Sequence, residues 1–256
     1  MSKKPIQVQA FEVKFALDAK RVLGAEGTPT PAVADALGVK DGSEDFQVAF
    51  LDGPHVDFHT ERWNIRFRDK GGKREVSFKR RLPVYHDSVQ GVLETALRQG
   101  FDEEEQAEGY DAEIEWGPAR RTLTLVKEKK LGAGPLPVDG RAAAVEAADS
   151  MPGKLRRWIR EGWAESVLAV GRLYGPVSAR RWKFTALGGK TAFEVWYLRS
   201  ADGDGAEPIV EVSFKAPSES EAATNREVLR SKLLAHPGWL LKDDMLKTDL
   251  LLDRYR

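Results

Sequence analysis

The sequence predicts a closed antiparallel β-barrel with helices packed on its outer surface. Three observations favour this fold class: strands with period-two alternation, hairpin turns marked by glycine or proline, and a repeated pentapeptide. The pentapeptide EVSFK occurs at Glu75–Lys79 and at Glu211–Lys215, each time closing a predicted hairpin. Two related halves of several antiparallel strands would naturally close into one barrel, because closure removes the exposed sheet edges.

We therefore expect one domain over residues 1–256, built from two related halves. The halves are predicted at about 1–130 and 141–256. The segment 130–140 between them is rich in glycine and proline and is the expected linker.

In the first half, Gln7–Leu17 alternates apolar and polar residues, which is typical of a strand with two different faces. Asp18 is placed to cap a short helix that starts at Ala19, and Pro31–Leu37 favours another. Further strands are predicted at Phe46–Leu51, Trp63–Arg68, Arg74–Arg81, Tyr110–Trp116 and Arg121–Lys127. Ser88–Gln99 has helical spacing, and we expect the acidic run Asp102–Glu105 to be a solvated loop.

In the second half, helical patterns cover Ala142–Ala148 and Lys154–Ser166. Hairpin arms are predicted at Leu168–Tyr174 with Ala179–Ala186 around Gly175–Pro176, and at Ala192–Arg199 with Pro208–Ala216. Ser218 and Glu221 form a capping box that starts a helix through Leu234. The tail is expected to hold a short helix or an edge strand at Met245–Arg254.

The composition excludes several classes of function. Forty basic and forty acidic residues cancel, which argues against a general nucleic-acid or membrane-surface binder. The chain has no cysteine, so disulfides, thiolate metal sites and cysteine nucleophiles are excluded. Without a signal peptide or a long apolar run, the protein is expected to be cytoplasmic and not bound to a membrane.

The polar faces of the predicted strands carry charges in rows. Some rows are basic and others acidic: Arg66 and Arg68 share one face, and Glu113 and Glu115 share another. In a barrel with helices outside, these faces point inward, and a charged lumen must balance its own charges or hold a charged ligand. Phosphate suits arginine and lysine, and carboxylate pairs suit a hard divalent cation that bridges phosphates.

In their order and spacing these motifs resemble the CYTH superfamily, the triphosphate tunnel metalloenzymes. The first strand, with Glu12 and Lys14, is similar to the ExExK signature of that family. Other segments resemble its RxR arm and the lysine of the next strand, its central ExE strand, and its C-terminal hairpins. The residues that carry this resemblance are Arg66 and Arg68, Lys79, Glu113 and Glu115, Arg181 and Lys183, Glu194, and Glu211 to Lys215.

The resemblance implies a tunnel of eight antiparallel strands and the hydrolysis or cyclisation of di- and triphosphates with Mg²⁺ or Mn²⁺. It assigns catalysis to Glu12, Lys14 and Glu113. The implied phosphate-binding residues are Arg66, Arg68, Lys79, Arg181, Lys183 and Lys215. The implied metal ligands are Glu12, Glu113, Glu115, Glu194 and Glu211.

The sequence also departs from the family pattern where carboxylates are expected. Ala10, Trp196 and Ser213 replace three of them, so a two-metal tunnel is not a straightforward expectation. Trp196 and Ser213 are instead predicted to line a substrate pocket, in which Trp196 favours a ligand with an organic part.

Three functions therefore stay open. The first is a metal-dependent hydrolase of an organic or inorganic triphosphate. The second is a repurposed tunnel enzyme that acts on an organic diphosphate, such as an isoprenyl diphosphate, with diphosphate as the leaving group. The third is a non-catalytic module that binds polyphosphate or a nucleotide. The expected partner in each case is a phosphorylated small molecule.

Overall fold

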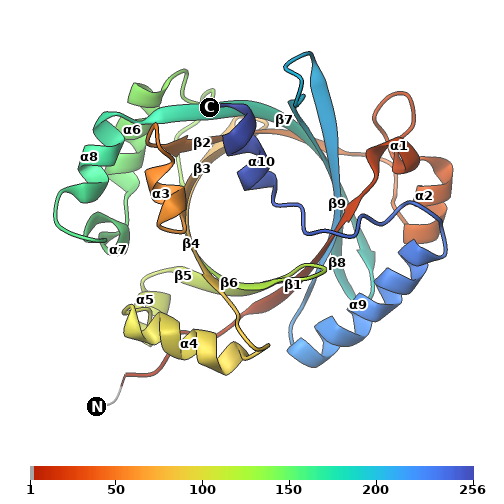
Figure 1. The fold of residues 1–256 in the computed structure, drawn as a ribbon, viewed down its shortest axis with the longest axis horizontal. Coiled ribbons are helices and arrows are strands. Elements are labelled where there is room, and N and C mark those ends of the chain that lie inside the picture. The colour runs from red at the N-terminus through yellow and green to blue at the C-terminus, as the bar shows by residue number, and fades with distance from the viewer. Residues whose placement is uncertain (1–2) are drawn as a thin grey trace.

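The computed structural model describes residues 3–256 as a ring of β-strands around a tunnel, with helices outside it (Figure 1). The strands are β1 Ala10–Leu17, β2 Glu44–Asp52, β3 Trp63–Lys70, β4 Lys73–Pro83, β5 Tyr110–Trp116, β6 Arg121–Lys130, β7 Arg172–Ala186, β8 Gly189–Arg199 and β9 Ala206–Ala216. Their order around the barrel is β1-β5-β6-β4-β3-β2-β7-β8-β9, and β9 pairs with β1 to close it.

The predicted barrel closure is confirmed, but the expectation of eight antiparallel strands is wrong. Nine strands form the ring within residues 3–256. An odd number of strands cannot alternate in direction all the way around a closed ring, so one neighbouring pair must be parallel. That pair, which we call the seam, joins Ala10–Val13 of β1 to Glu113–Trp116 of β5. The other pairs are antiparallel.

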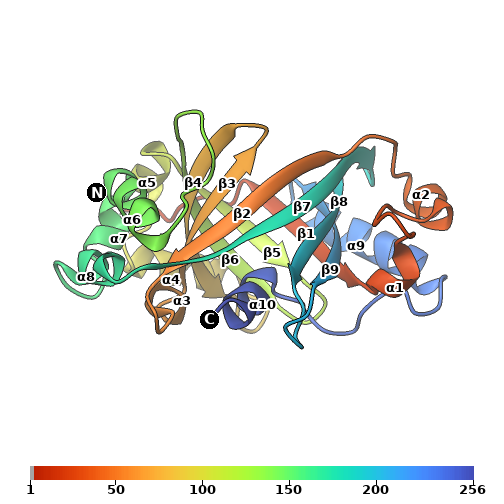
Figure 2. The ribbon, with the colours of Figure 1, turned by 90° about the horizontal axis from the view of Figure 1, so that it is seen from above.

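Helices cover the outer face of the barrel, as predicted, except for the last one, and Figure 2 shows most of them grouped on two opposite sides of it. They are α1 Ala19–Val22, α2 Pro31–Leu37, α3 Asp57–Thr60, α4 Val89–Arg98, α5 Glu103–Ala107, α6 Gly140–Ser150, α7 Gly153–Arg156, α8 Trp163–Ala169, α9 Glu219–Leu234 and α10 Lys247–Arg254. The main apolar core lies between these helices and the outward strand residues, among them Phe11, Val13 and Phe15 of β1. Period-two alternation thus places the apolar residues of β1 outside and its polar residues in the lumen.

The predicted hairpin around Gly175–Pro176 is wrong, because these residues lie inside the single long strand β7. Tyr174 pairs with Phe50 and Val177 pairs with Val48, so Gly175 and Pro176 together stand opposite one residue of β2. This is a β-bulge, which accommodates a proline that cannot donate to the ladder. Gly175 has φ +114°, and a Cβ there would lie 3.0 Å from the carbonyl oxygen of Val48.

Two other local predictions are corrected. The acidic run is not a loop: Asp102 is 2% exposed and caps α5 by accepting from the backbone N–H groups of Glu104 and Glu105. The helix predicted over Lys154–Ser166 is broken into α7 and α8, with Ile159 and Gly162 at positive φ between them. Both differences depend on local backbone geometry that hydrophobic spacing does not report.

The C-terminal helix α10 lies over the opening of the ring, at one mouth of the tunnel, rather than on the outer sides of the barrel (Figures 1 and 2). Leu251 and Leu252 are buried in a second apolar cluster with Phe46, Phe50 and Trp196, which line the tunnel. The lumen is therefore not polar throughout, as the strand patterns predicted. One side of it is apolar and is covered by the tail of the chain.

The segment between β6 and α6 forms neither helix nor strand, and the relation between the two halves stays a prediction. The two EVSFK segments lie in β4 and β9, each in the second strand of a hairpin. None of the helices in residues 3–256 is both long and apolar enough to cross a membrane.

Candidate functional site

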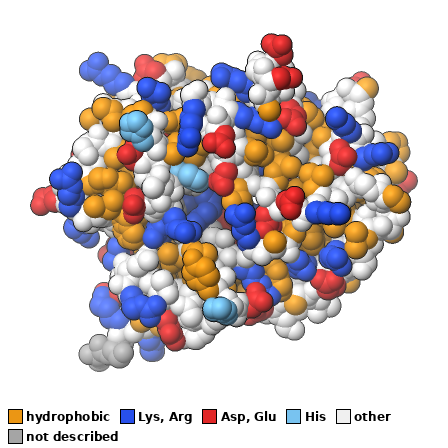
Figure 3. All heavy atoms as spheres, viewed as in Figure 1, with side chains coloured by type: hydrophobic (Ala, Val, Ile, Leu, Met, Phe, Trp, Pro, Cys, Tyr) orange, Lys and Arg blue, Asp and Glu red, His pale blue; other side chains and the backbone are white. Residues whose placement is uncertain are grey.

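The barrel encloses a cavity of about 1520 Å³, which receives side chains from each of the nine strands of the ring. Figure 3 shows one mouth of the tunnel, with lysine and arginine side chains gathered in the central hollow. Every residue predicted from the sequence as a site residue lines this cavity. The structure thus brings the predicted set together, and their individual roles stay predictions.

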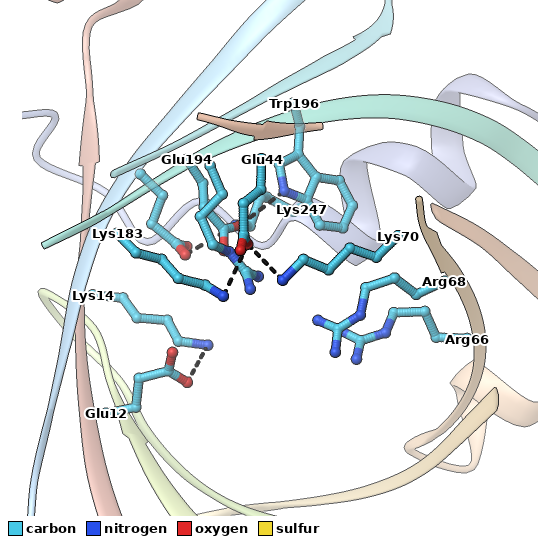
Figure 4. A network of polar contacts seen from close by, with 12 residues as sticks. Glu12, Lys14, Glu44, Arg66, Arg68, Lys70, Lys183, Glu194, Trp196 and Lys247 are labelled. Atoms are coloured by element: carbon cyan, nitrogen blue, oxygen red, sulfur yellow. Dashed lines mark hydrogen bonds and ion pairs between the residues drawn. The ribbon is translucent and has the colours of Figure 1, made fainter. Parts of the chain in front are cut away.

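One wall of the tunnel is basic and is formed by β3 and β4. Arg66 and Arg68 project from β3, and Lys79 and Arg81 from β4 (Figure 4 shows the first two pointing into the lumen). Arg68 is paired with Glu75 at 2.5 Å, whereas Arg66 is 3.6 Å or more from Glu128 and Glu75. We call Arg66, Arg68, Lys79 and Arg81 the basic wall.

The basic wall holds more positive charge than its neighbours neutralise. Burial together with the nearby guanidinium of Arg66 lowers the pKa of Lys79 to about 7. Burial and Arg68 lower the pKa of Arg66 to about 10. The Nε atom of Arg66 is buried and has no hydrogen-bond partner within the described residues. A bound anion would relieve both the charge repulsion and the missing hydrogen bond.

Across the tunnel, the first strand presents a lysine between two carboxylates. The Lys14 Nζ atom lies 3.0 Å from Glu12 and 3.3 Å from Glu115. Although burial opposes the charge, Glu115 and Glu12 raise the pKa of Lys14 above its ordinary value. Burial likewise opposes the charge of Glu115, but Lys14 and Arg81 hold its pKa well below the usual range. Both groups are therefore charged at neutral pH.

The C-terminal hairpins form a second ionic cluster. Glu194 accepts from Arg181 at 2.5 Å and from the indole N–H of Trp196 at 3.0 Å. The Lys247 Nζ atom lies 2.9 Å from both Glu194 and Glu211 (Figure 4). Near this cluster, Glu44 lies between Lys70 and Lys183, at 2.6 and 2.8 Å.

Trp196 faces the lumen, as predicted, but only 5% of its surface is exposed. Its ring meets the edge of Phe46, and the Lys247 ammonium lies 4.8 Å from its centroid. Ser213 is similarly buried, at 6% exposed. Trp196 thus packs against Phe46 and against the tail of its own chain.

Several residues that line the lumen are not among the site residues predicted from the sequence. Arg81 follows Lys79 by two positions on the same strand face, so the period-two pattern contains enough information to find it. Glu44 is the first residue of β2, but the predicted second strand begins only at Phe46, so the prediction leaves Glu44 outside the strand. Lys247 lies in the tail, and nothing in its local pattern indicates that it enters the barrel.

The carboxylates do not fit a metal centre made by the protein alone. In residues 3–256, no group of three histidine, aspartate or glutamate side chains is close enough to hold a metal ion. Each of the five predicted metal ligands instead pairs with a lysine: Glu12 and Glu115 with Lys14, Glu113 with Lys215, and Glu194 and Glu211 with Lys247. Metal dependence therefore stays a prediction.

Comparison by sequence finds no matching family model and no matching curated protein. The structure, however, is similar to that of a candidate adenylyl cyclase from Hippeastrum, reported to have a dominant triphosphatase activity. The TM-score is 0.55 at 14% identity, over 94% of each chain. A candidate adenylate cyclase from Bacillus halodurans gives a TM-score of 0.50 at 12% identity, over 97% of this chain and 98% of that one.

The chain shares the closed tunnel fold of these two proteins. The resemblance that the sequence motifs indicate is thus confirmed at the level of the fold, over nearly the whole chain. In this tunnel fold the basic wall and the paired carboxylates face each other across one cavity.

Proposed function

We propose that this CYTH-fold protein binds the phosphate chain of an organic or inorganic triphosphate in its tunnel and hydrolyses it. The observation that carries the proposal is the basic wall, where buried cations repel one another and one buried N–H group is unpartnered. The repulsion within this wall destabilises the empty tunnel. An anion with several charges, such as a triphosphate, relieves that repulsion.

In the proposed reaction, a water oxygen attacks the terminal phosphorus and the bridging P–O bond breaks, releasing phosphate and diphosphate. Arg66, Lys79 and Arg81 bind the phosphate oxygens and stabilise the charge that develops on them. Glu12 and Glu113 are the proposed acceptors for the proton of the attacking water, and Lys14 orients Glu12 through their ion pair. The predicted role of Mg²⁺ or Mn²⁺ is to neutralise phosphate charge.

The test is phosphate release from tripolyphosphate, thiamine triphosphate, ATP and an RNA 5′-triphosphate. Each substrate is assayed with Mg²⁺, with Mn²⁺ and with a chelator, which also tests the metal prediction. We expect turnover of at least one substrate, and its loss in Arg66→Ala. Folded protein with no turnover of any of them would refute the hydrolase.

A second candidate, a non-catalytic phosphate-binding module, is favoured by the pairing of the acidic residues. Because Glu12, Glu113 and Glu115 each pair with a lysine, the tunnel neutralises the carboxylates that hydrolysis would use. Calorimetry with tripolyphosphate distinguishes the two functions, since the module binds it without releasing phosphate.

The alternative of an organic diphosphate substrate has the apolar side of the lumen in its favour. Phe46, Phe50 and Trp196 supply aromatic faces that would shield a carbocation, although Leu251 and Leu252 cover part of this surface. Incubation with isoprenyl diphosphates and analysis for hydrocarbon products tests it.

A further inference from the structure

The inference concerns the carboxylate pair Glu194 and Glu211. These residues stand directly opposite each other in the β8–β9 ladder, and both side chains face the lumen. Two carboxylates so placed repel each other unless a cation lies between them. In a tunnel that holds phosphates, a divalent metal ion is the ordinary choice for that position.

The position is already filled by a cation of the chain itself. The Lys247 Nζ atom lies 2.9 Å from an oxygen of each carboxylate, and the three side chains are only 14%, 9% and 12% exposed. Glu194 has no free oxygen, because its other contacts are with Arg181 and the indole N–H of Trp196. A metal ion would have to displace these donors.

The tail is fixed on both sides of Lys247, so the Lys247 ammonium is held in place between the two carboxylates. Before it, Leu241 donates to the carbonyl of Ala16, and Asp244 accepts from the backbone N–H of Ala119. After it, Leu251 and Leu252 are buried against the apolar side of the lumen. Figure 4 shows Lys247 beside Glu194 and Trp196.

We propose that the Lys247 ammonium is a built-in cation that takes the place of a divalent metal ion between Glu194 and Glu211. The charges of Glu194 and Glu211 are then balanced without a metal ion. The proposal concerns the tunnel of the proposed function but rests on the ion pairs and not on turnover.

The test is Mn²⁺ binding to the full chain in the absence of phosphate, followed by electron paramagnetic resonance of free Mn²⁺. With Lys247 present, the single substitution Glu211→Gln leaves the number of bound Mn²⁺ ions unchanged, because Lys247 already neutralises Glu211. Removal of the ammonium in Lys247→Ala creates one additional Mn²⁺ site. That site is lost again in Lys247→Ala combined with Glu211→Gln.

The matched control is Lys242→Ala, which removes an exposed lysine of the same tail and leaves Mn²⁺ binding as in the wild type. Lys247→Met, which keeps the apolar length of the side chain, replaces the alanine variant if that one fails to fold. The proposal is overturned if the single variant Glu211→Gln binds fewer Mn²⁺ ions than the wild type, or if removal of the Lys247 ammonium adds no Mn²⁺ site. Neither result depends on phosphate release, so the test still decides this proposal if the protein does not hydrolyse triphosphates.

Discussion

At the residue scale, Lys79 shows how the tunnel stores electrostatic strain. It lies on β4 beside Arg66 and Arg81, and burial with these like charges lowers its pKa to about 7. The unfolded chain keeps the ordinary lysine pKa, so between about pH 7 and 10.5 it binds more protons than the folded one. Through this group the folded state therefore becomes more stable as the pH rises across that window.

The first prediction is that Lys79→Met weakens binding and stabilises the fold. Loss of a charged hydrogen bond to phosphate costs about 1.5–3 kcal/mol, a roughly tenfold to hundredfold loss of affinity for tripolyphosphate. The melting temperature of the free protein rises, because the repelled charge is gone. Calorimetry and thermal unfolding measure the two effects. Lys73→Ala, at the exposed end of the same strand, is the control and changes neither. Unchanged affinity in Lys79→Met would contradict the role of Lys79.

The second prediction concerns protons. At about pH 8 the free protein holds Lys79 mostly neutral, and a bound phosphate chain raises its pKa toward the ordinary value. Binding therefore takes up a proton at pH 8 and almost none at pH 6. Calorimetry in buffers of different ionisation enthalpy measures the uptake. Lys79→Arg keeps the charge without titrating, so its proton uptake on binding comes from the ligand alone. Equal proton uptake by the wild type and by Lys79→Arg would refute the assignment of the proton to Lys79.

At the element scale, the long strand β7 depends on its bulge. Gly175 and Pro176 shift the register against β2 between Val48 and Phe50, which lets β7 stay in the barrel over Arg172–Ala186. The positions beyond the bulge include Arg181 and Lys183, so the bulge sets which side chains of β7 face the lumen.

The third prediction is that Gly175→Ala destabilises the protein by about 1–3 kcal/mol, the cost of a side chain at an unfavourable positive φ. The added Cβ would also lie 3.0 Å from the carbonyl oxygen of Val48. Denaturant unfolding measures the loss. Gly132→Ala is the control, because a Cβ there meets nothing within 4 Å. Equal stability of the two variants would show that the bulge tolerates a side chain.

At the scale of the whole molecule, the seam is where the ring closes. β1 pairs with β9 over Phe11–Leu17 but with β5 only over Ala10–Val13. Parallel pairing is slightly less stable per residue than antiparallel pairing. The barrel therefore has one short, weaker joint between strands that are distant in the sequence.

The fourth prediction is that the barrel opens first at the seam. Backbone amides of β5 that face β1 exchange hydrogen faster than those between β8 and β9, because local opening there breaks fewer hydrogen bonds. Hydrogen exchange followed by mass spectrometry measures this. Tripolyphosphate is expected to slow exchange at the seam, since Glu12 and Glu115 of the seam line the tunnel. Uniform protection around the ring would contradict the prediction.

The sequence by itself determined most of the strands, their two faces and many of the charged side chains of the tunnel wall. Period-two alternation is a local property, so Glu12, Arg66, Lys79 and Glu113 could be placed on lumen faces before any pairing was known. The order of these motifs also indicated the tunnel fold, which the solved structures confirm.

Only the tertiary structure decided how the charges are paired. The ninth strand and the parallel seam follow from closing an odd ring, which no single strand pattern reports. The tail enters the lumen because Leu251 and Leu252 bury against an apolar side formed by four separate strands. That long-range packing brings Lys247 to Glu194 and Glu211, two of the predicted metal ligands, and pairs both with one ammonium group.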